Sequence, residues 1–184
     1  MLRKRLFVVV MALVMGTVFL AGCQSNTSTG TLFIYSKDYS DIASWGSMVT
    51  PGGGEGSVTK GDSVAVIQAA EDGWGGVQSE EVTLDLTKAP ILLVQISECA
   101  DEYKWGIKFV PSDPAVEDHA WGFYLIEDNN FKWNNYGGVD IKNKLGDEFV
   151  DLYGESVKGV FWIYATGGPE ATVEVTTVKM FNQK

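Results

Sequence analysis

Apolar residues from position 31 onward occur in short runs that are rich in Val, Ile, Phe, Tyr and Trp. Gly, Pro, Asn and Asp interrupt these runs about every ten residues, and no segment beyond residue 22 keeps an apolar repeat at helical spacing. The pattern predicts an all-β domain, a sandwich or a barrel, with room for one helical turn within 146–156. The expected strands are residues 31–35, 56–60, 63–69, 74–79, 82–86, 91–97, 104–110, 120–127, 139–141, 158–166 and 171–181.

Alternation within these strands predicts which side chains face the core. The expected core positions are Leu92, Val94 and Ile96 in one strand, and Tyr103, Trp105, Ile107 and Phe109 in the next. Trp121 also heads an alternating apolar set, so we expect it in the core. Strand 158–166 differs because both of its faces are apolar, with Trp162 and Tyr164 on the second one. That second face is a candidate binding surface.

The first 22 residues have the pattern of an export signal. A basic segment, Arg3-Lys4-Arg5, precedes a 14-residue apolar run at 6–19, which is shorter than the roughly 20 residues that span a bilayer. The run ends in Leu20-Ala21-Gly22-Cys23, which resembles the lipobox of bacterial lipoproteins. The resemblance implies cleavage before Cys23, a diacylglycerol on its thiol and fatty acids such as palmitate as the membrane anchor.

The expected organisation is therefore a signal peptide at 1–22, a lipidated flexible tether at 23–30 and one folded domain at 31–184. Gln24 follows the lipidated cysteine, which by resemblance to sorting rules implies the outer membrane in a Gram-negative host. A Gram-positive host would keep the protein on the outer face of its cell membrane. Cys99 is then the remaining thiol, so no internal disulfide is expected, and we interpret it as inert at a strand end.

Composition and charge narrow the function. The chain is 45% hydrophobic and 12% aromatic, which fits a globular protein with a core and excludes wholesale disorder. Its formal charge is −10, and because residues 1–22 hold three basic and no acidic side chains, the remainder carries −13. A nucleic-acid partner is excluded, since phosphate binding needs a basic surface.

Several segments resemble, in order and spacing, the galactose-binding-like jelly-roll domains, many of which are carbohydrate-binding modules. The segments are 90–97, 104–109, 149–152, 158–168 and 171–181, and the resemblance covers 74–181. It implies a jelly-roll β-sandwich of two antiparallel sheets. It also implies core positions at Phe161, Ile163 and Ala165, and a ligand side that carries Leu93, Gln95, Lys104, Lys108, Trp162 and Tyr164. Where many such modules place an acidic residue for a structural calcium, this chain has Thr176 and Thr177, so the final strand does not support a calcium site. We expect no cofactor and no metal, and a structural calcium stays open as the alternative.

Two aromatic clusters are candidate carbohydrate sites, because sugars stack their C–H faces on rings and bond polar side chains at their edges. In the first, Trp162 and Tyr164 would stack, with Gln95, Lys104 and Lys108 as edge partners. The second is an expected loop at 131–138 that contains Trp133, Asn134 and Tyr136. Its rings either contact ligand or cap the end of the core. Trp45 and Trp74 have no assignment from sequence.

Enzyme signatures are weak in this sequence. His119 has no second His or Cys nearby for a metal site and is interpreted as a surface loop residue, and no Gly-x-Ser-x-Gly turn is present. The expected function is non-catalytic binding of a glycan or polysaccharide by a lipid-anchored surface protein. Three alternatives stay open: binding of an envelope or adhesion protein partner, a structural envelope lipoprotein with all rings in the core, and a glycoside hydrolase.

Overall fold

The computed structural model describes residues 33–51, 56–100, 102–129 and 133–183, with the side chains of 128–129 and 133–136 outside that description. The described residues belong to one compact unit, Phe33–Lys184. The predicted signal peptide, Cys23 and the tether lie outside the described residues. In the described part of the chain, no helix is long and apolar enough to cross a membrane.

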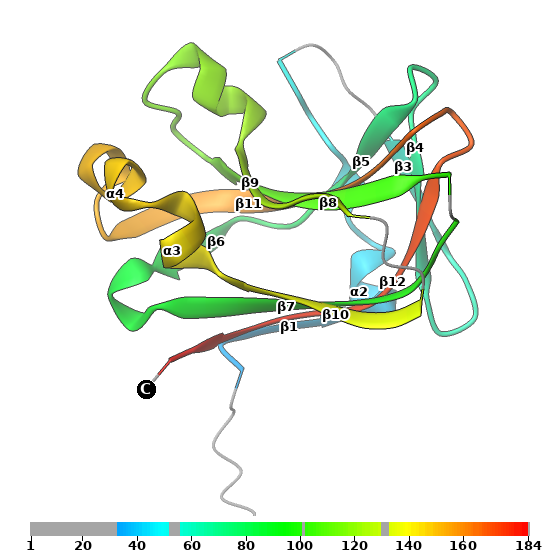
Figure 1. Ribbon diagram of the computed structural model, residues 1–184, viewed down its shortest axis with the longest axis horizontal. Coiled ribbons are helices and arrows are strands. Elements are labelled where there is room, and N and C mark those ends of the chain that lie inside the picture. Colours follow the sequence, from blue (N-terminus) through cyan, green and yellow to red (C-terminus); the bar gives the residue numbers. More distant parts are fainter. Residues whose placement is uncertain (1–32, 52–55, 101, 130–132, 184) are drawn as a thin grey trace, which may run out of the picture. The chain divides into compact units, whose positions relative to one another are not determined.

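The described strands form two antiparallel sheets of six strands each, so the predicted all-β sandwich is confirmed (Figure 1). Sheet A contains β1 (Tyr35–Asp38), β3 (Gly56–Lys60), β4 (Ala65–Ala69), β7 (Pro90–Cys99), β10 (Trp133–Asp140) and β12 (Thr172–Asn182). Sheet B contains β2 (Gly46–Ser47), β5 (Trp74–Gln78), β6 (Val82–Asp85), β8 (Lys104–Pro111), β9 (Phe123–Asn129) and β11 (Ser156–Thr166). Each expected strand overlaps an observed one.

The connectivity is that of a jelly roll. Sheet A has the order β10-β7-β12-β4-β3, with β1 also on β12, and sheet B has the order β2-β5-β11-β8-β9, with β6 also on β11. The chain crosses between the sheets at both steps from β1 to β3, from β4 to β5, from β6 to β7, from β7 to β8, and at every step from β9 to β12. Four-stranded sets β4-β12-β7-β10 and β5-β11-β8-β9 therefore face each other, as in two interleaved Greek keys.

The core lies between the sheets and confirms the predicted facing. Leu92, Val94 and Ile96 of β7 are fully buried, as are Trp105, Ile107 and Phe109 of β8 and Phe161, Ile163 and Ala165 of β11. Burial of each large apolar side chain stabilises the fold by about 1.5–3 kcal/mol. The rings of Phe109 and Phe161 meet edge to face across β8 and β11, with 5.8 Å between their centroids.

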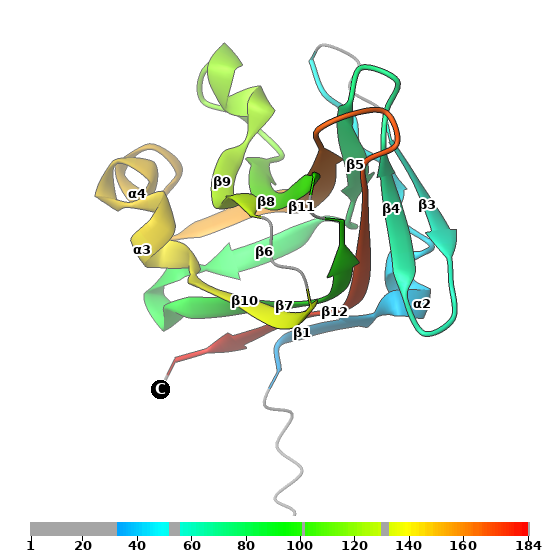
Figure 2. The same cartoon turned by 45° about the vertical axis from the view of Figure 1, so that its right-hand side comes forward.

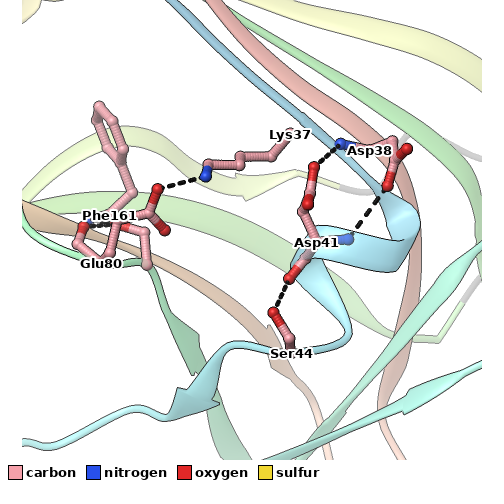
Figure 3. Close-up of polar contacts among 7 residues, drawn as sticks. Lys37, Asp38, Asp41, Ser44, Glu80 and Phe161 are labelled. Carbon is pink, nitrogen blue, oxygen red and sulfur yellow. Dashed lines mark hydrogen bonds and ion pairs between the residues drawn. The ribbon is translucent and has the colours of Figure 1, made fainter.

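The amino-terminal part of the domain ties the two sheets together (Figure 3). Lys37 on β1 forms an ion pair of 2.6 Å with Glu80, which lies between β5 and β6 of the other sheet. Asp38 and Asp41 form a capping box that starts the short helix α2 (Tyr39–Ile42). Because the Lys37–Glu80 pair is partly exposed, its contribution to stability is small.

Two short helices lie together at one end of the sandwich in Figure 1. The helix α4 (Asp147–Tyr153) lies within the predicted 146–156 turn, and α3 (Ile141–Leu145) precedes it. Two 3-10 helices, η1 (Leu86–Lys88) and η2 (Glu117–Trp121), were not expected from the sequence pattern. The expected strand at 120–127 begins only at Phe123, because η2 extends to Trp121 and is capped by Gly122, whose φ of +70° breaks the extended conformation.

The expected loop at 131–138 is wrong, because residues 133–140 form strand β10. Asn and Gly are poor strand formers, which favoured a loop. Pairing along β7 overrides that preference, with Gly137 opposite Val94 and Gly138 opposite Leu93. A Cβ at 137 would lie 2.7 Å from Cδ1 of Ile126, so a larger residue here would require that side chain to shift.

Candidate aromatic binding face

The outer face of sheet B carries a second hydrophobic cluster, separate from the core. Its buried members are Met48, Val110, Trp162 and Tyr164, and Trp74 and Val160 pack against them. Lys108, Trp121 and Tyr124 contact these residues from β8, η2 and β9. We call these nine residues the outer aromatic face. In Figures 1 and 2, segments 46–51 and 112–122 both rise above this side of sheet B.

Strand register explains why the rings gather there. Trp162 and Tyr164 alternate with core residues along β11, and they pair with Lys108 and Gly106 of β8. A Cβ at position 106 would overlap the hydroxyl and ring of Tyr164. The glycine therefore leaves the space into which the Tyr164 ring lies across β8.

A buried ammonium lies among these rings. Lys108 is 5% exposed, and its Nζ donates a hydrogen bond of 2.9 Å to the backbone carbonyl of Trp121. The same Nζ lies 4.1 Å from the ring centroid of Tyr124 and 5.6 Å from that of Trp74. Contacts of this kind contribute about 0.5–2 kcal/mol each and offset part of the cost of desolvating a charge. One cation thus links β5, β8, β9 and η2.

The solvent-exposed rings are Trp121 and Tyr124, with 40% and 38% of their surface accessible. Trp74 is half-buried beside them, 6.4 Å from Trp121 between ring centroids and tilted by 53°. The expectation that Trp121 is a core residue is therefore wrong. Trp121 is the last residue of η2, so it does not take part in the strand alternation that begins at Phe123.

Trp162 and Tyr164 lie on the outer face, as predicted, but they are buried there, with 1% and 0% exposure. Trp74 covers them, at 6.5 Å from Trp162 and 5.6 Å from Tyr164 between centroids. Among the described residues, the Trp162 indole N–H has no hydrogen-bond partner. These two rings form the layer that supports the exposed ones, so a ligand reaches Trp162 only if neighbours in this cluster, Trp74 among them, move.

The polar residues expected beside Trp162 divide between two surfaces. Lys108 is directly opposite Trp162, and Lys104 is exposed on the same side of β8, opposite Thr166. Gln95 instead belongs to β7 of sheet A, where it pairs with Thr177 and Tyr136. The expectation that Gln95 shares a face with Trp162 is wrong, because a sandwich has two outer faces and alternation alone does not distinguish them.

The second predicted cluster lies on the other sheet. Trp133, Asn134 and Tyr136 belong to β10, at the edge of sheet A. Their side chains lie outside the described residues, so their contact with ligand stays a prediction.

A polar contact holds the segment that carries Trp121. His119 Nδ1 lies 2.7 Å from the hydroxyl of Tyr153, and that hydroxyl accepts a hydrogen bond of 3.0 Å from the Ala115 N–H. The His119 ring also packs on Phe123, at 4.7 Å between centroids. His119 is therefore half-buried against α4 and β9, and the expectation of a surface loop residue is wrong.

The thiol of Cys99, the acidic residues and one surface hollow were the other places to look for a functional site. Burial raises the pKa of the Cys99 thiol to about 11, so it is protonated at neutral pH and a poor nucleophile. Within the described ranges, no group of three His, Cys, Asp or Glu side chains is placed to hold a metal ion. An open hollow of about 590 Å³ at the β3–β4 end is lined by small and acidic residues and includes no member of the outer aromatic face.

The chain was compared with protein-family models and with curated proteins, and neither comparison found a match.

Proposed function

We propose that this protein is a lipid-anchored surface protein whose jelly-roll domain binds carbohydrate without catalysis, through the outer aromatic face. The observation that carries the proposal is the exposure of Trp121 and Tyr124 on a surface that a buried cation and two buried rings hold in place. Exposed large aromatics on a rigid scaffold are typical of a binding surface.

The chemistry of this face suits a sugar. Indole and phenol rings offer apolar surfaces to the C–H face of a pyranose. The rings are ordered before ligand arrives, since Lys108 contacts Tyr124, Trp74 and the Trp121 carbonyl. Such preorganisation lowers the entropy cost of binding.

The proposed role is non-catalytic because the side chains of the outer aromatic face include no carboxyl group. Its nine members are aromatic rings, aliphatic side chains and one ammonium. Glycoside hydrolysis needs a pair of carboxyl groups across the scissile bond, and none of these side chains provides one. A glycoside hydrolase therefore ranks below binding as an interpretation.

Membrane attachment is proposed from the sequence. The basic segment at 3–5, the apolar run at 6–19 and the lipobox-like motif that ends at Cys23 support an acylated amino terminus. Two acyl chains hold a protein at the bilayer, while the tether at 23–30 gives the domain reach toward a polymer outside the cell.

A protein partner is the second candidate. Val49 is 71% exposed and follows Met48, a buried member of the outer aromatic face, so the apolar surface extends beyond the rings. Trp and Tyr are enriched at the centres of protein interfaces. A purely structural role, with all rings in the core, is not favoured, since Trp121 and Tyr124 are exposed.

A glycan array tests the proposal. The full chain, purified in a polyoxyethylene detergent without a sugar head group, is compared with Trp121→Ala and with Leu152→Ala. Leu152 is 57% exposed on α4, is not a member of the outer aromatic face, and serves as the matched control. We expect glycan binding that Trp121→Ala loses and Leu152→Ala keeps. No glycan signal with the unaltered chain would contradict the proposal and favour a protein partner.

A further inference from the structure

The angle between the rings of Trp74 and Trp121, and the charges near them, point to a class of carbohydrate. This inference rests on the function proposed above. We propose that the face binds single chains of a neutral, water-soluble polysaccharide. It does not bind the flat surface of a crystalline polysaccharide, and it does not bind an anionic one.

The first argument is geometric. A crystalline polysaccharide presents its sugar rings in one plane, so side chains that stack on it together must be nearly coplanar. The rings of Trp74 and Trp121 are neighbours, with centroids 6.4 Å apart, but they are inclined by 53°. Both cannot lie flat on one plane. A free chain turns at each glycosidic bond and offers successive sugars at different angles, which matches two inclined rings.

The inclination is fixed by the layer beneath. Trp74 packs on the buried rings of Trp162 and Tyr164, and the Trp121 carbonyl is held by Lys108 Nζ at 2.9 Å. A rotation of the Trp74 indole toward the plane of Trp121 would disturb its contacts with these two buried rings, which is costly in a close-packed cluster. The layer beneath therefore holds Trp74 at its angle, and the hydrogen bond from Lys108 holds the backbone that carries Trp121.

The second argument is electrostatic. The ammonium of Lys108 is 5% exposed and already contacts a carbonyl and two rings, so it offers little to an anionic ligand. Segment 112–122, which supplies Trp121, contains three exposed acidic residues, Asp113, Glu117 and Asp118, and no Lys or Arg. Lys104 adds one positive charge on the same side of β8. An anionic chain at Trp121 would meet like charge, whereas a neutral chain would not.

The experiment compares three kinds of polymer with the full chain in the detergent described above. Native affinity gels contain hydroxyethyl cellulose, xyloglucan, galactomannan or mixed-linkage glucan as neutral chains, and alginate or polygalacturonate as anionic ones. Pull-down uses microcrystalline cellulose and crystalline chitin. Trp121→Ala and Leu152→Ala are run in every arm. We expect retardation by at least one neutral polymer, weakened about tenfold or more in Trp121→Ala, and no binding to crystalline or anionic polymers.

The outcomes separate the two proposals. Binding to a crystalline or an anionic polymer that matches the best neutral one, and that needs Trp121, would overturn the ligand class and leave carbohydrate binding standing. Binding that Trp121→Ala does not weaken would overturn the assignment of the face, and with it this inference. Absence of binding in all three arms would overturn the proposed function itself.

Discussion

The ammonium of Lys108 donates a hydrogen bond of 2.9 Å to the backbone carbonyl of Trp121, a residue 13 positions further along the chain. Lys108 is almost completely buried, whereas the Trp121 ring is the most exposed indole named on the outer aromatic face. The contact holds the backbone that carries a surface ring, through a charge that solvent hardly reaches. It makes Lys108 a positioning residue for the proposed site.

Replacement of Lys108 by Met should affect binding more than stability. The variant loses a charged hydrogen bond and two cation–π contacts, but it also removes the cost of burying an ammonium, which is several kcal/mol. These terms oppose each other, so we expect the free energy of unfolding to change by about 1 kcal/mol or less in urea titrations. Glycan affinity should fall about tenfold, because η2 and Tyr124 lose their common anchor. Unchanged affinity would show that the cation does not position the rings.

Trp162 and Trp121 should behave in opposite ways when each is replaced by Ala. Trp162 is 1% exposed, so its truncation leaves a cavity, and we expect a loss of about 3–5 kcal/mol in the free energy of unfolding. Trp121→Ala removes an exposed ring and should cost about 1 kcal/mol or less. Urea unfolding followed by far-UV circular dichroism measures both. Equal losses would mean that Trp121 is buried in solution.

Gly106→Ala tests the space that the Tyr164 ring occupies. A methyl group at 106 would overlap that ring, whereas a Cβ at Gly46 meets nothing within 4 Å. We expect Gly106→Ala to lower the free energy of unfolding by about 1–3 kcal/mol, as overpacking does. Gly46→Ala is the matched control and should change it by about 0.5 kcal/mol or less. A tolerated Gly106→Ala would contradict the described position of Tyr164.

Acylation should depend on Cys23 and not on Cys99. In bacteria grown with an alkyne analogue of palmitate, the chain should carry the label, and Cys23→Ser should lose it. Cys99→Ser should keep the label, because the Cys99 thiol is buried and its pKa is raised to about 11. A label that survives in Cys23→Ser would refute the lipoprotein prediction.

The sequence pattern predicted the fold better than the site, for physical reasons. Alternation along a strand is local, so the facing of Trp105, Phe109 and Phe161 toward the core followed from residues next to them. The burial of Trp162 did not follow, because Met48 and Trp74, which lie far away in sequence, pack in the cluster that covers it. Gln95 was placed on the wrong face because alternation does not say which sheet a strand joins.

The exposure of Trp121 depends on a single local feature that the strand alternation does not reveal. The apolar alternation from 120 onward favours a strand, but η2 extends to Trp121, and the positive φ of its capping residue Gly122 separates Trp121 from β9. A glycine directly after Glu117-Asp118-His119-Ala120-Trp121 was the available signal, since helical turns commonly end at such a residue. Trp74 had no comparable signal, because its role depends on β5 pairing with β11.

Protection of tryptophan from oxidation tests the central claim most directly. The full chain is treated with limiting N-bromosuccinimide, with and without a polysaccharide that retards it in gels, and oxidation of each indole is measured by peptide mass spectrometry. We predict that Trp121, which is 40% exposed, is oxidised in the free protein and protected by the glycan, while Trp105 and Trp162, at 0% and 1%, stay unmodified in both samples. Protection of Trp133 with no change at Trp121 would contradict the account and place the ligand on β10 of the other sheet.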